Sequence, residues 1–137
     1  MKVRAASWVA DGAALMGDAV HAGHPHVAQG TFQAMEDAKV LSDVFTQCFG
    51  RGDFSAGALA PYEEVRRPVV TRLQWVADEY AWLWETKNLV LTRLRDRIFQ
   101  NVGSRPDLLQ KVAATEAGID IRPFTILERL QALGVCA

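Results

Sequence analysis

The chain has 137 residues, a formal net charge of −1 and a composition that is half hydrophobic, as expected of one ordinary globular domain. The balance of acidic and basic residues argues against a nucleic-acid-binding surface, and the apolar runs are too short and interrupted for a membrane span. Two distant cysteines, Cys48 and Cys136, form no metal-binding or redox motif. We therefore expect a cytoplasmic protein with reduced thiols.

The predicted elements begin with a short β segment. Residues 3–9 form a mixed apolar run, and Asp11-Gly12 predicts a tight turn. Residues 13–16 then predict a short buried strand that ends at Gly17-Asp18. An apolar strand that stops at Gly-Asp indicates a carboxyl end that opens onto a site.

A loop is expected next, over residues 18–29. It contains Gly23, Pro25 and the three histidines, His21, His24 and His26. A helix is predicted over residues 30–49, because apolar side chains recur at helical spacing. The members of this stripe are Ala34, Ala38, Leu41, Phe45 and Cys48.

Long helices are predicted over residues 55–102 and short C-terminal helices over residues 107–134. Pro61 suits a first helical turn, whereas Pro68 predicts a kink or two separate helices, since an interior proline removes a hydrogen bond. The fold class is therefore mainly α, with a short N-terminal β segment, a loop rich in glycine, histidine and proline, and several helices. No repeat divides the chain, so residues 1–137 are treated as one domain.

The block from Gly17 to Leu41 carries the chemistry of the predicted site. A helix N-terminus presents unpaired N–H groups and a partial positive charge, which can receive an anion or a polarised carbonyl. Asp18 at the strand end can accept hydrogen bonds from ligand hydroxyls. Together these features suit a ligand that carries both a polyol and an electron-poor carbonyl ring.

This block resembles the Gly-Asp motif of the group A flavin monooxygenases, the aromatic hydroxylases of the para-hydroxybenzoate hydroxylase type. The matching positions are Gly17, Asp18, Ala19, His21, Pro25, Gln29, Gly30, Asp37 and Ala38. Downstream, residues 62–68 (Tyr-Glu-Glu-Val-Arg-Arg-Pro) match the Tyr-Glu-x-x-Arg-Arg-Pro helix of that family, which accounts for Pro68. The resemblance covers residues 17–68 well and the remainder loosely.

The resemblance implies an FAD cofactor, NAD(P)H as co-substrate and hydroxylation of a small aromatic or polyketide-like substrate. Asp18 would bind the ribityl chain, and Pro25 would lie beside the isoalloxazine ring. Backbone amides at the helix start would face N1 and the C2 carbonyl of the flavin. The cofactor-binding residues implied are Gly17, Asp18, Pro25, Ala28, Gln29, Gly30 and Thr31. The family usually has glycine at Ala28, where a methyl group could restrict the loop torsions or the approach of the backbone to the ring.

The G-x-G-x-x-G fingerprint for the ADP half of FAD does not occur in this sequence. We therefore expect the chain to resemble the C-terminal part of an FAD/NAD(P)-binding α/β fold, a partial domain of a truncated or split enzyme. Such a segment would not catalyse the whole reaction alone. Its expected partner is an N-terminal companion chain or a second copy in a homodimer.

Two other functions stay open. The chain could be a flavin-free helical binding or dimerisation module, with exposed apolar faces covered by its partner. It could also be a cofactor-independent cyclase or isomerase that uses Asp18 with His21, His24 and His26 as acid and base.

Three groups of residues invite a functional role that we do not favour. A metal ion held by Asp18 and the three histidines is not expected, because nothing in the spacing fixes a coordination geometry. Glu36 and Asp37 are expected on a solvated helix face or in an interaction with the helix macrodipole near its N-terminus. Trp75, Trp82 and Trp84 are expected in the core or at an interface.

Overall fold

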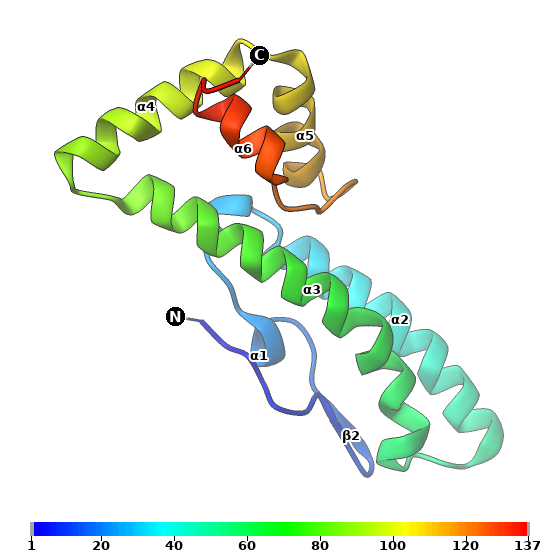
Figure 1. The fold of residues 1–137 in the computed structure, drawn as a ribbon. Coiled ribbons are helices and arrows are strands. Elements are labelled where there is room, and N and C mark those ends of the chain that lie inside the picture. Colours follow the sequence, from blue (N-terminus) through cyan, green and yellow to red (C-terminus); the bar gives the residue numbers. More distant parts are fainter. Residues whose placement is uncertain (1, 137) are drawn as a thin grey trace.

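The structure is a computed structural model that describes residues 2–136. Helices dominate these residues, which confirms the predicted mainly α fold with a short N-terminal β segment (Figure 1). The elements in chain order are β1 (Val9–Ala10), β2 (Ala13–Ala14), α1 (Asp18–His21), the 3₁₀ turn η1 (Pro25–Val27), α2 (Gly30–Arg51), α3 (Ala56–Glu85), α4 (Leu89–Gly103), α5 (Pro106–Glu116) and α6 (Ile126–Ala132).

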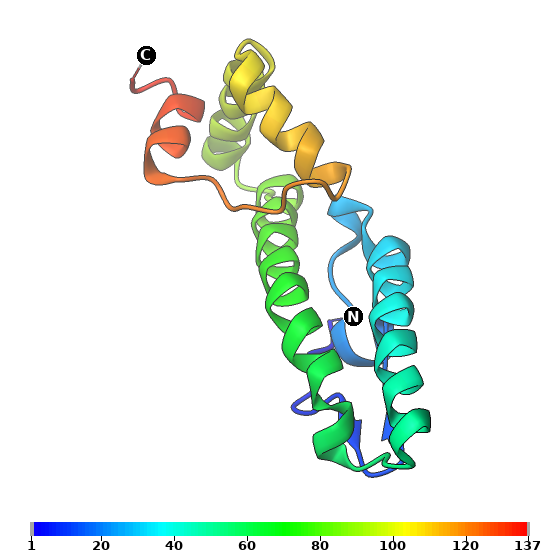
Figure 2. The same cartoon turned by 90° about the vertical axis from the view of Figure 1, so that its right-hand side faces the viewer.

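The long helices α2 and α3 lie side by side and run in opposite directions (Figure 2). The chain reverses at Gly52, which adopts the left-handed conformation (φ 66°) and donates its amide to the Cys48 carbonyl. Ser55 then caps α3 by accepting a hydrogen bond from the Ala58 amide at 3.3 Å. Asp11, at the tip of the β1–β2 hairpin, accepts the Ala56 amide at 2.7 Å. Local capping therefore fixes both the helix turn and the hairpin against it.

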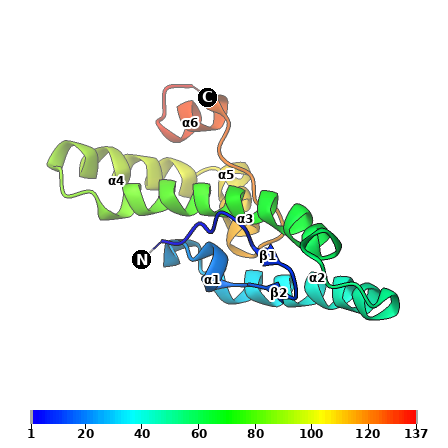
Figure 3. The same ribbon diagram turned by 90° about the horizontal axis from the view of Figure 1, so that it is seen from below.

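The main core lies where the N-terminal segment packs on α2 and α3 (Figure 3). Tyr62 is fully buried there, and its hydroxyl donates to the Leu15 carbonyl at 3.1 Å. Gln74 of α3 donates to the carbonyls of Val3 and Ala22, which ties the first residues of the segment to the helix. The buried members of this core are Trp8, Val20, Leu41, Val44, Cys48, Leu59, Tyr62 and Val70.

The C-terminal helices α4, α5 and α6 gather at the far end of α3 (Figure 1). They bury little: among their described residues only Leu108, Thr115 and Ala132 are classed as buried. Thr125 and Glu128 form a reciprocal capping box at the start of α6. Local hydrogen bonds therefore contribute more to this region than a shared apolar core does.

The N-terminal segment departs from two predictions. The strand expected over residues 13–16 is limited to Ala13–Ala14, and Leu15 is 51% exposed, so this strand is not buried. β2 pairs only with β1, and the sheet of the described residues has these two strands alone. The loop expected over residues 18–29 contains the single turns α1 and η1.

The buried face of α2 is also shifted from the predicted apolar stripe. Leu41 and Cys48 are buried as expected, but Ala38 is exposed and the polar residues Gln33 and Asp37 are buried instead. The prediction of a solvated Asp37 is therefore wrong. The physical reason is an ion pair with α3, described below.

Helix α3 runs without interruption from Ala56 to Glu85 although Pro61 and Pro68 lie inside it. Of the two alternatives expected at Pro68, one kinked helix or two helices, the structure has one helix. Both prolines lie on the exposed side, so water can reach the Gly57 and Glu64 carbonyls that would otherwise accept the missing N–H groups.

The tryptophans Trp75, Trp82 and Trp84 are each more than half exposed, so their expected place in the core is wrong. Their role at an interface stays a prediction. A search of the described residues finds no helix with the length and apolar character needed to cross a membrane.

Candidate functional site

A pocket of about 510 Å³ lies between α1, η1, the start of α2 and the middle of α3. Its first wall comes from the block singled out in the sequence and includes Asp18, His21, His24, Pro25, Ala28, Gly30 and Thr31. Its second wall comes from α3 and consists of Val70, Leu73, Gln74 and Ala77. One wall is therefore rich in polar groups and backbone, while the other is mainly apolar.

The carboxylate of Asp18 lies next to the first turn of α2. A Cβ atom placed on Gly30 would lie 4.0 Å from Asp18 Oδ1. Among the described residues no side chain caps this helix start, and none of the hydrogen bonds involves the Asp18 carboxylate. A hydrogen-bond acceptor and a set of unpaired N–H donors therefore face the same pocket.

Ala28 adopts the left-handed conformation, with φ 51° and ψ 22°, and is the only described non-glycine residue with positive φ. Its amide donates to the Pro25 carbonyl at 2.8 Å, which closes the turn before α2. A residue with a Cβ atom adopts this conformation at a cost of about 1–2 kcal/mol. Glycine adopts this conformation without that cost, which is the physical reason to expect glycine at this position.

Asp37 lies behind the pocket and is fully buried. Its Oδ2 atom accepts the Gly17 amide at 2.9 Å and lies 2.6 Å from Nε2 of His21, while Oδ1 accepts from Nε of Arg66 at 2.8 Å. Burial raises the pKa of the Asp37 carboxyl, but the hydrogen bonds from His21, Arg66 and Gly17 outweigh it and hold this pKa below its ordinary value. Asp37 is therefore an ionised acceptor, and His21 donates its Nε2 proton.

Arg66 extends this cluster across the two long helices. Its Nη2 atom donates to the Gln33 carbonyl at 3.2 Å and to Gln33 Oε1 at 2.7 Å. We call Gly17, His21, Gln33, Asp37 and Arg66 the Asp37 network. It joins the turn at Gly17, α1, α2 and α3, and so fixes the Gly-Asp turn relative to the start of α2.

Gly17 is required by this geometry. Its φ is 59°, and a Cβ atom here would lie 3.2 Å from the Cβ of Ala34. It is buried and contributes an amide to Asp37, so the structure gives it a positioning role behind the pocket.

Gln29 is buried and also lies outside the pocket lining. Its Nε2 donates to the Glu116 carbonyl at the end of α5, and its Oε1 is buried without a hydrogen-bond partner in the described part of the chain. The side chain of Gln29 therefore links α5 to the site.

The structure thus brings five of the seven predicted cofactor-binding residues to one pocket, namely Asp18, Pro25, Ala28, Gly30 and Thr31. Of the weak catalytic candidates, His21 is held by Asp37, and His24 and His26 lie near Glu85. Because the Nε2 atom of His21 is already hydrogen-bonded to the buried Asp37 carboxylate, His21 is the least available of the three histidines for acid–base chemistry with Asp18.

Asp37 and Arg66 are the residues that the sequence interpretation missed as parts of the site. A signal was present: Asp37 lies four residues before Leu41, and Arg66 lies four residues from both Tyr62 and Val70. When an acidic residue on one helix and a basic residue on another each lie on the apolar face of their helix, they indicate a buried ion pair between the two helices.

Comparison with known proteins agrees with the pocket geometry. A family model described as FAD binding domain matches residues 1–76, more than half of the chain. The chain is 40% identical over 74 residues to a 6-hydroxynicotinate 3-monooxygenase of Bordetella bronchiseptica, covering 54% of this chain and 19% of the relative. It is 40% identical over 72 residues to a 3-hydroxybenzoate 6-hydroxylase of Klebsiella oxytoca, covering 53% and 17%.

A salicylate hydroxylase of Pseudomonas putida is 32% identical over 95 residues, covering 69% of this chain and 22% of the relative. The chain therefore spans about a fifth of the length of these relatives.

Proposed function

The chain belongs to the FAD binding domain family, and from this premise we propose that it forms the flavin-contacting part of an FAD-dependent aromatic monooxygenase. The observation that carries the proposal is the shared pocket, in which the Asp18 carboxylate lies beside the N-terminus of α2. A ligand with both a polyol and a carbonyl-bearing ring needs a hydrogen-bond acceptor for its hydroxyls and N–H donors for its carbonyl in the same pocket.

The pocket residues fit the flavin end of the cofactor. Asp18 would accept hydrogen bonds from ribityl hydroxyls, and the first amides of α2 at Gly30 and Thr31 would donate to the polar edge of the ring. A helix start of this kind stabilises a negative charge by about 0.3–1 kcal/mol when exposed, and up to about 2 kcal/mol when partly buried. Pro25 has no amide hydrogen and a fixed φ, so it presents a rigid apolar surface beside the ring.

The second wall suits the flat face of an aromatic ring. Val70, Leu73 and Ala77 supply apolar surface from α3, and the pocket volume of about 510 Å³ is within the range of small-molecule sites. When bound, FAD supplies the redox chemistry, and the protein supplies binding, orientation and electrostatics. The Asp37 network would keep the two polar elements of the site in register.

Substrate and co-substrate are proposed from the relatives. The names of three of them specify hydroxynicotinate, hydroxybenzoate and salicylate, so we propose a small substituted aromatic ring as substrate. NAD(P)H is proposed as the reductant of the complete enzyme.

The test is a titration of the purified chain with riboflavin, FMN, FAD and ADP, followed by flavin fluorescence and absorbance. We expect the three flavins to bind and ADP not to compete, because the proposed contacts all go to the flavin end. Asp18→Asn should weaken flavin binding about tenfold, the equivalent of one charged hydrogen bond of about 1.4 kcal/mol. Asp43→Asn, at an exposed carboxylate further along α2, serves as the matched control. Absence of binding by all three flavins, or equal affinity in both variants, would overturn the proposal.

A further inference from the structure

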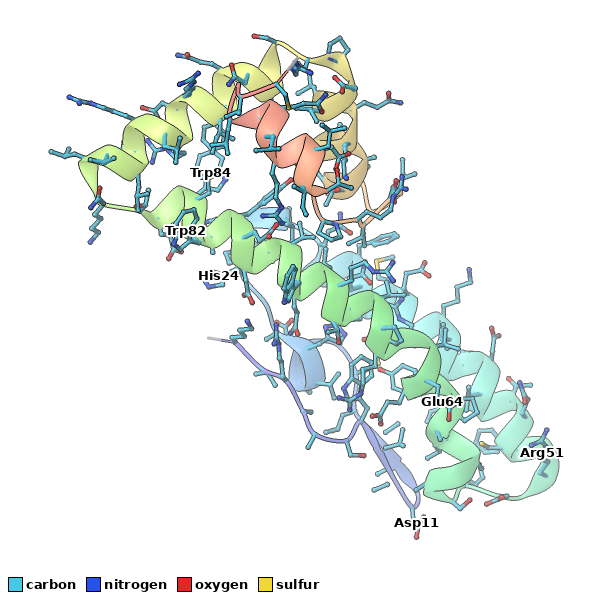
Figure 4. The ribbon with its side chains drawn as sticks, in the orientation of Figure 1. Asp11, His24, Arg51, Glu64, Trp82 and Trp84 are labelled. Carbon is cyan, nitrogen blue, oxygen red and sulfur yellow. The ribbon has the colours of Figure 1, made fainter. Side chains whose placement is uncertain are left out.

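Two histidines and a glutamate from different elements meet at the edge of the pocket. His24 precedes η1, His26 lies within it, and Glu85 is the last residue of α3. Nδ1 of His24 and Nε2 of His26 each lie 3.8 Å from Oε1 of Glu85. Figure 4 shows His24 beside the end of α3, on the side of Trp82. His24 also lines the pocket, whereas His26 and Glu85 do not, so this cluster lies at the pocket rim.

The spacing of the three groups is close to that of a metal site. One ligand atom from each residue lies within 4.8 Å of the other two. Ligands of a tetrahedral Zn²⁺ ion at 2.0–2.1 Å are about 3.3–3.5 Å apart. Each histidine nitrogen therefore needs to approach Glu85 by a few tenths of an ångström, and the two nitrogens need to lie equally close to each other. Glu85 can make its part of this movement, because its side chain is 62% exposed, and the two half-buried imidazole rings need small rotations.

The donor set selects the kind of ion. Imidazole nitrogens bind zinc, copper and nickel well, and two histidines with one carboxylate form a common three-ligand zinc set with an open fourth position. The two imidazole rings are half-buried and meet edge to face, with centroids 5.8 Å apart, so their orientation is already constrained. We propose that His24, His26 and Glu85 form a binding site for a divalent transition-metal ion, with Zn²⁺ as the expected occupant.

The cluster differs from the metal set that the sequence invited us to consider. His21 is bound to Asp37 and is absent from the cluster, as is Asp18, and Glu85 takes their place. The competing explanation is a simple ion pair, in which protonated histidines hold η1 against the end of α3. A metal ion and a proton compete for the same nitrogen atoms. A metal site therefore predicts saturable binding of Zn²⁺, whereas a simple ion pair predicts none.

The experiment uses the full chain without a polyhistidine tag, after treatment with a chelator. Zn²⁺ is added in a calorimetric titration, and affinity is confirmed by competition with a chromophoric zinc chelator. We expect one saturable site with an affinity in the micromolar range, and a higher midpoint of thermal unfolding with Zn²⁺ present. His24→Ala, His26→Ala and Glu85→Gln should each weaken binding roughly tenfold or more, on the scale known for altered metal sites.

Glu64→Gln is the matched control, because Glu64 is an exposed carboxylate on the same helix at a distance from the cluster (Figure 4). Circular dichroism establishes that each variant is folded. Cu²⁺ gives a second readout, since the ring of His26 lies 6.4 Å from that of Trp84, and bound Cu²⁺ should quench tryptophan fluorescence. Absence of saturable Zn²⁺ binding, or binding that the three variants leave unchanged, would overturn the proposal. Flavin affinity is measured separately, so the result for Zn²⁺ binding does not depend on whether the proposed flavin site is correct.

Discussion

Two histidine–carboxylate clusters adjoin the pocket, one behind it and one at its rim, and they differ in what surrounds the carboxylate. In the Asp37 network, behind the pocket, the carboxylate is fully buried and accepts from His21, Arg66 and the Gly17 amide. At the rim, Glu85 is largely exposed and lies 3.8 Å from each of two histidines. Histidine and a carboxylate therefore form a structural cluster behind the pocket, where every carboxylate oxygen has a hydrogen-bond donor. At the rim they form a cluster whose nitrogen and oxygen atoms are open to a ligand.

The difference follows from burial and from the number of donors. A buried carboxylate is tolerated only when its oxygens accept hydrogen bonds. For Asp37 the donors are His21, the Arg66 guanidinium and the Gly17 amide. Such a group has no capacity left for an external ion. At the rim, solvent replaces those donors, so nitrogen and oxygen atoms stay available to a ligand.

Replacement of Asp37 by asparagine should have the largest effect. The change leaves the Arg66 guanidinium buried without a countercharge, and we expect a loss of about 3–5 kcal/mol in the free energy of unfolding. Urea denaturation followed by circular dichroism measures it. Asp43→Asn on the exposed face of α2 should cost less than about 0.5 kcal/mol.

A double variant keeps this prediction testable if Asp37→Asn does not fold. Asp37→Leu combined with Arg66→Met removes both charges, and should be more stable than Asp37→Asn alone because no unpaired charge stays buried. Equal stability of parent and Asp37→Asn would contradict the structural role of the network.

Acid should weaken the Asp37 network before the pH reaches the pKa of the folded carboxyl. Because the folded-state pKa is lowered, the stabilisation is complete above the unfolded-state value of about 3.9 and is lost as the pH falls from there through the folded pKa. The free energy of unfolding, measured from pH 7 down to pH 2.5, should fall more steeply in the parent than in the Asp37→Leu, Arg66→Met variant. Parallel curves would show that Asp37 does not link folding to proton binding.

Ala28→Gly should stabilise the turn between η1 and α2, which lines the pocket. Glycine adopts φ 51° without the strain that alanine carries, and this gain exceeds the greater flexibility of glycine in the unfolded chain. We expect a net gain of up to about 1 kcal/mol, measured by urea denaturation. Ala38→Gly, at an exposed helical position, is the opposite control and should lose about 1 kcal/mol. Destabilisation by both changes would show that Ala28 is not strained.

Glu85→Gln should have the smallest effect on folding. An exposed ion pair contributes little, so we expect a change below about 0.5 kcal/mol without metal. With Zn²⁺ present, the parent should gain stability that this variant lacks. Thermal unfolding with and without Zn²⁺ measures both values. A large loss in the free energy of unfolding in metal-free buffer would show that Glu85 has a structural role like that of Asp37, and would contradict the contrast between the two clusters.

Much of the fold and the position of the site could be predicted because their signals are local. Helical periodicity predicted α2, and the Gly-Asp block predicted that Asp18 and the start of α2 would lie together, as they do in one pocket. The strand at residues 13–16 was predicted as buried because an apolar run does not reveal whether a second layer covers it. The core alternative for Trp75, Trp82 and Trp84 was wrong for the same reason, since helical spacing does not say which face of a helix has a partner.

By itself, the sequence determined the mainly α fold, the family resemblance and the wall of the pocket that comes from the Gly-Asp block, because each depends on spacing within a short stretch of chain. The tertiary structure decided which charges are buried and which histidines share a carboxylate. Asp37 meets Arg66 from a position 29 residues away, and His24, in the loop before η1, lies near Glu85 at the end of α3, only because α2, α3 and η1 pack together. Burial and the number of hydrogen-bond donors around each carboxylate arise from that packing, and they separate the structural cluster from the open one.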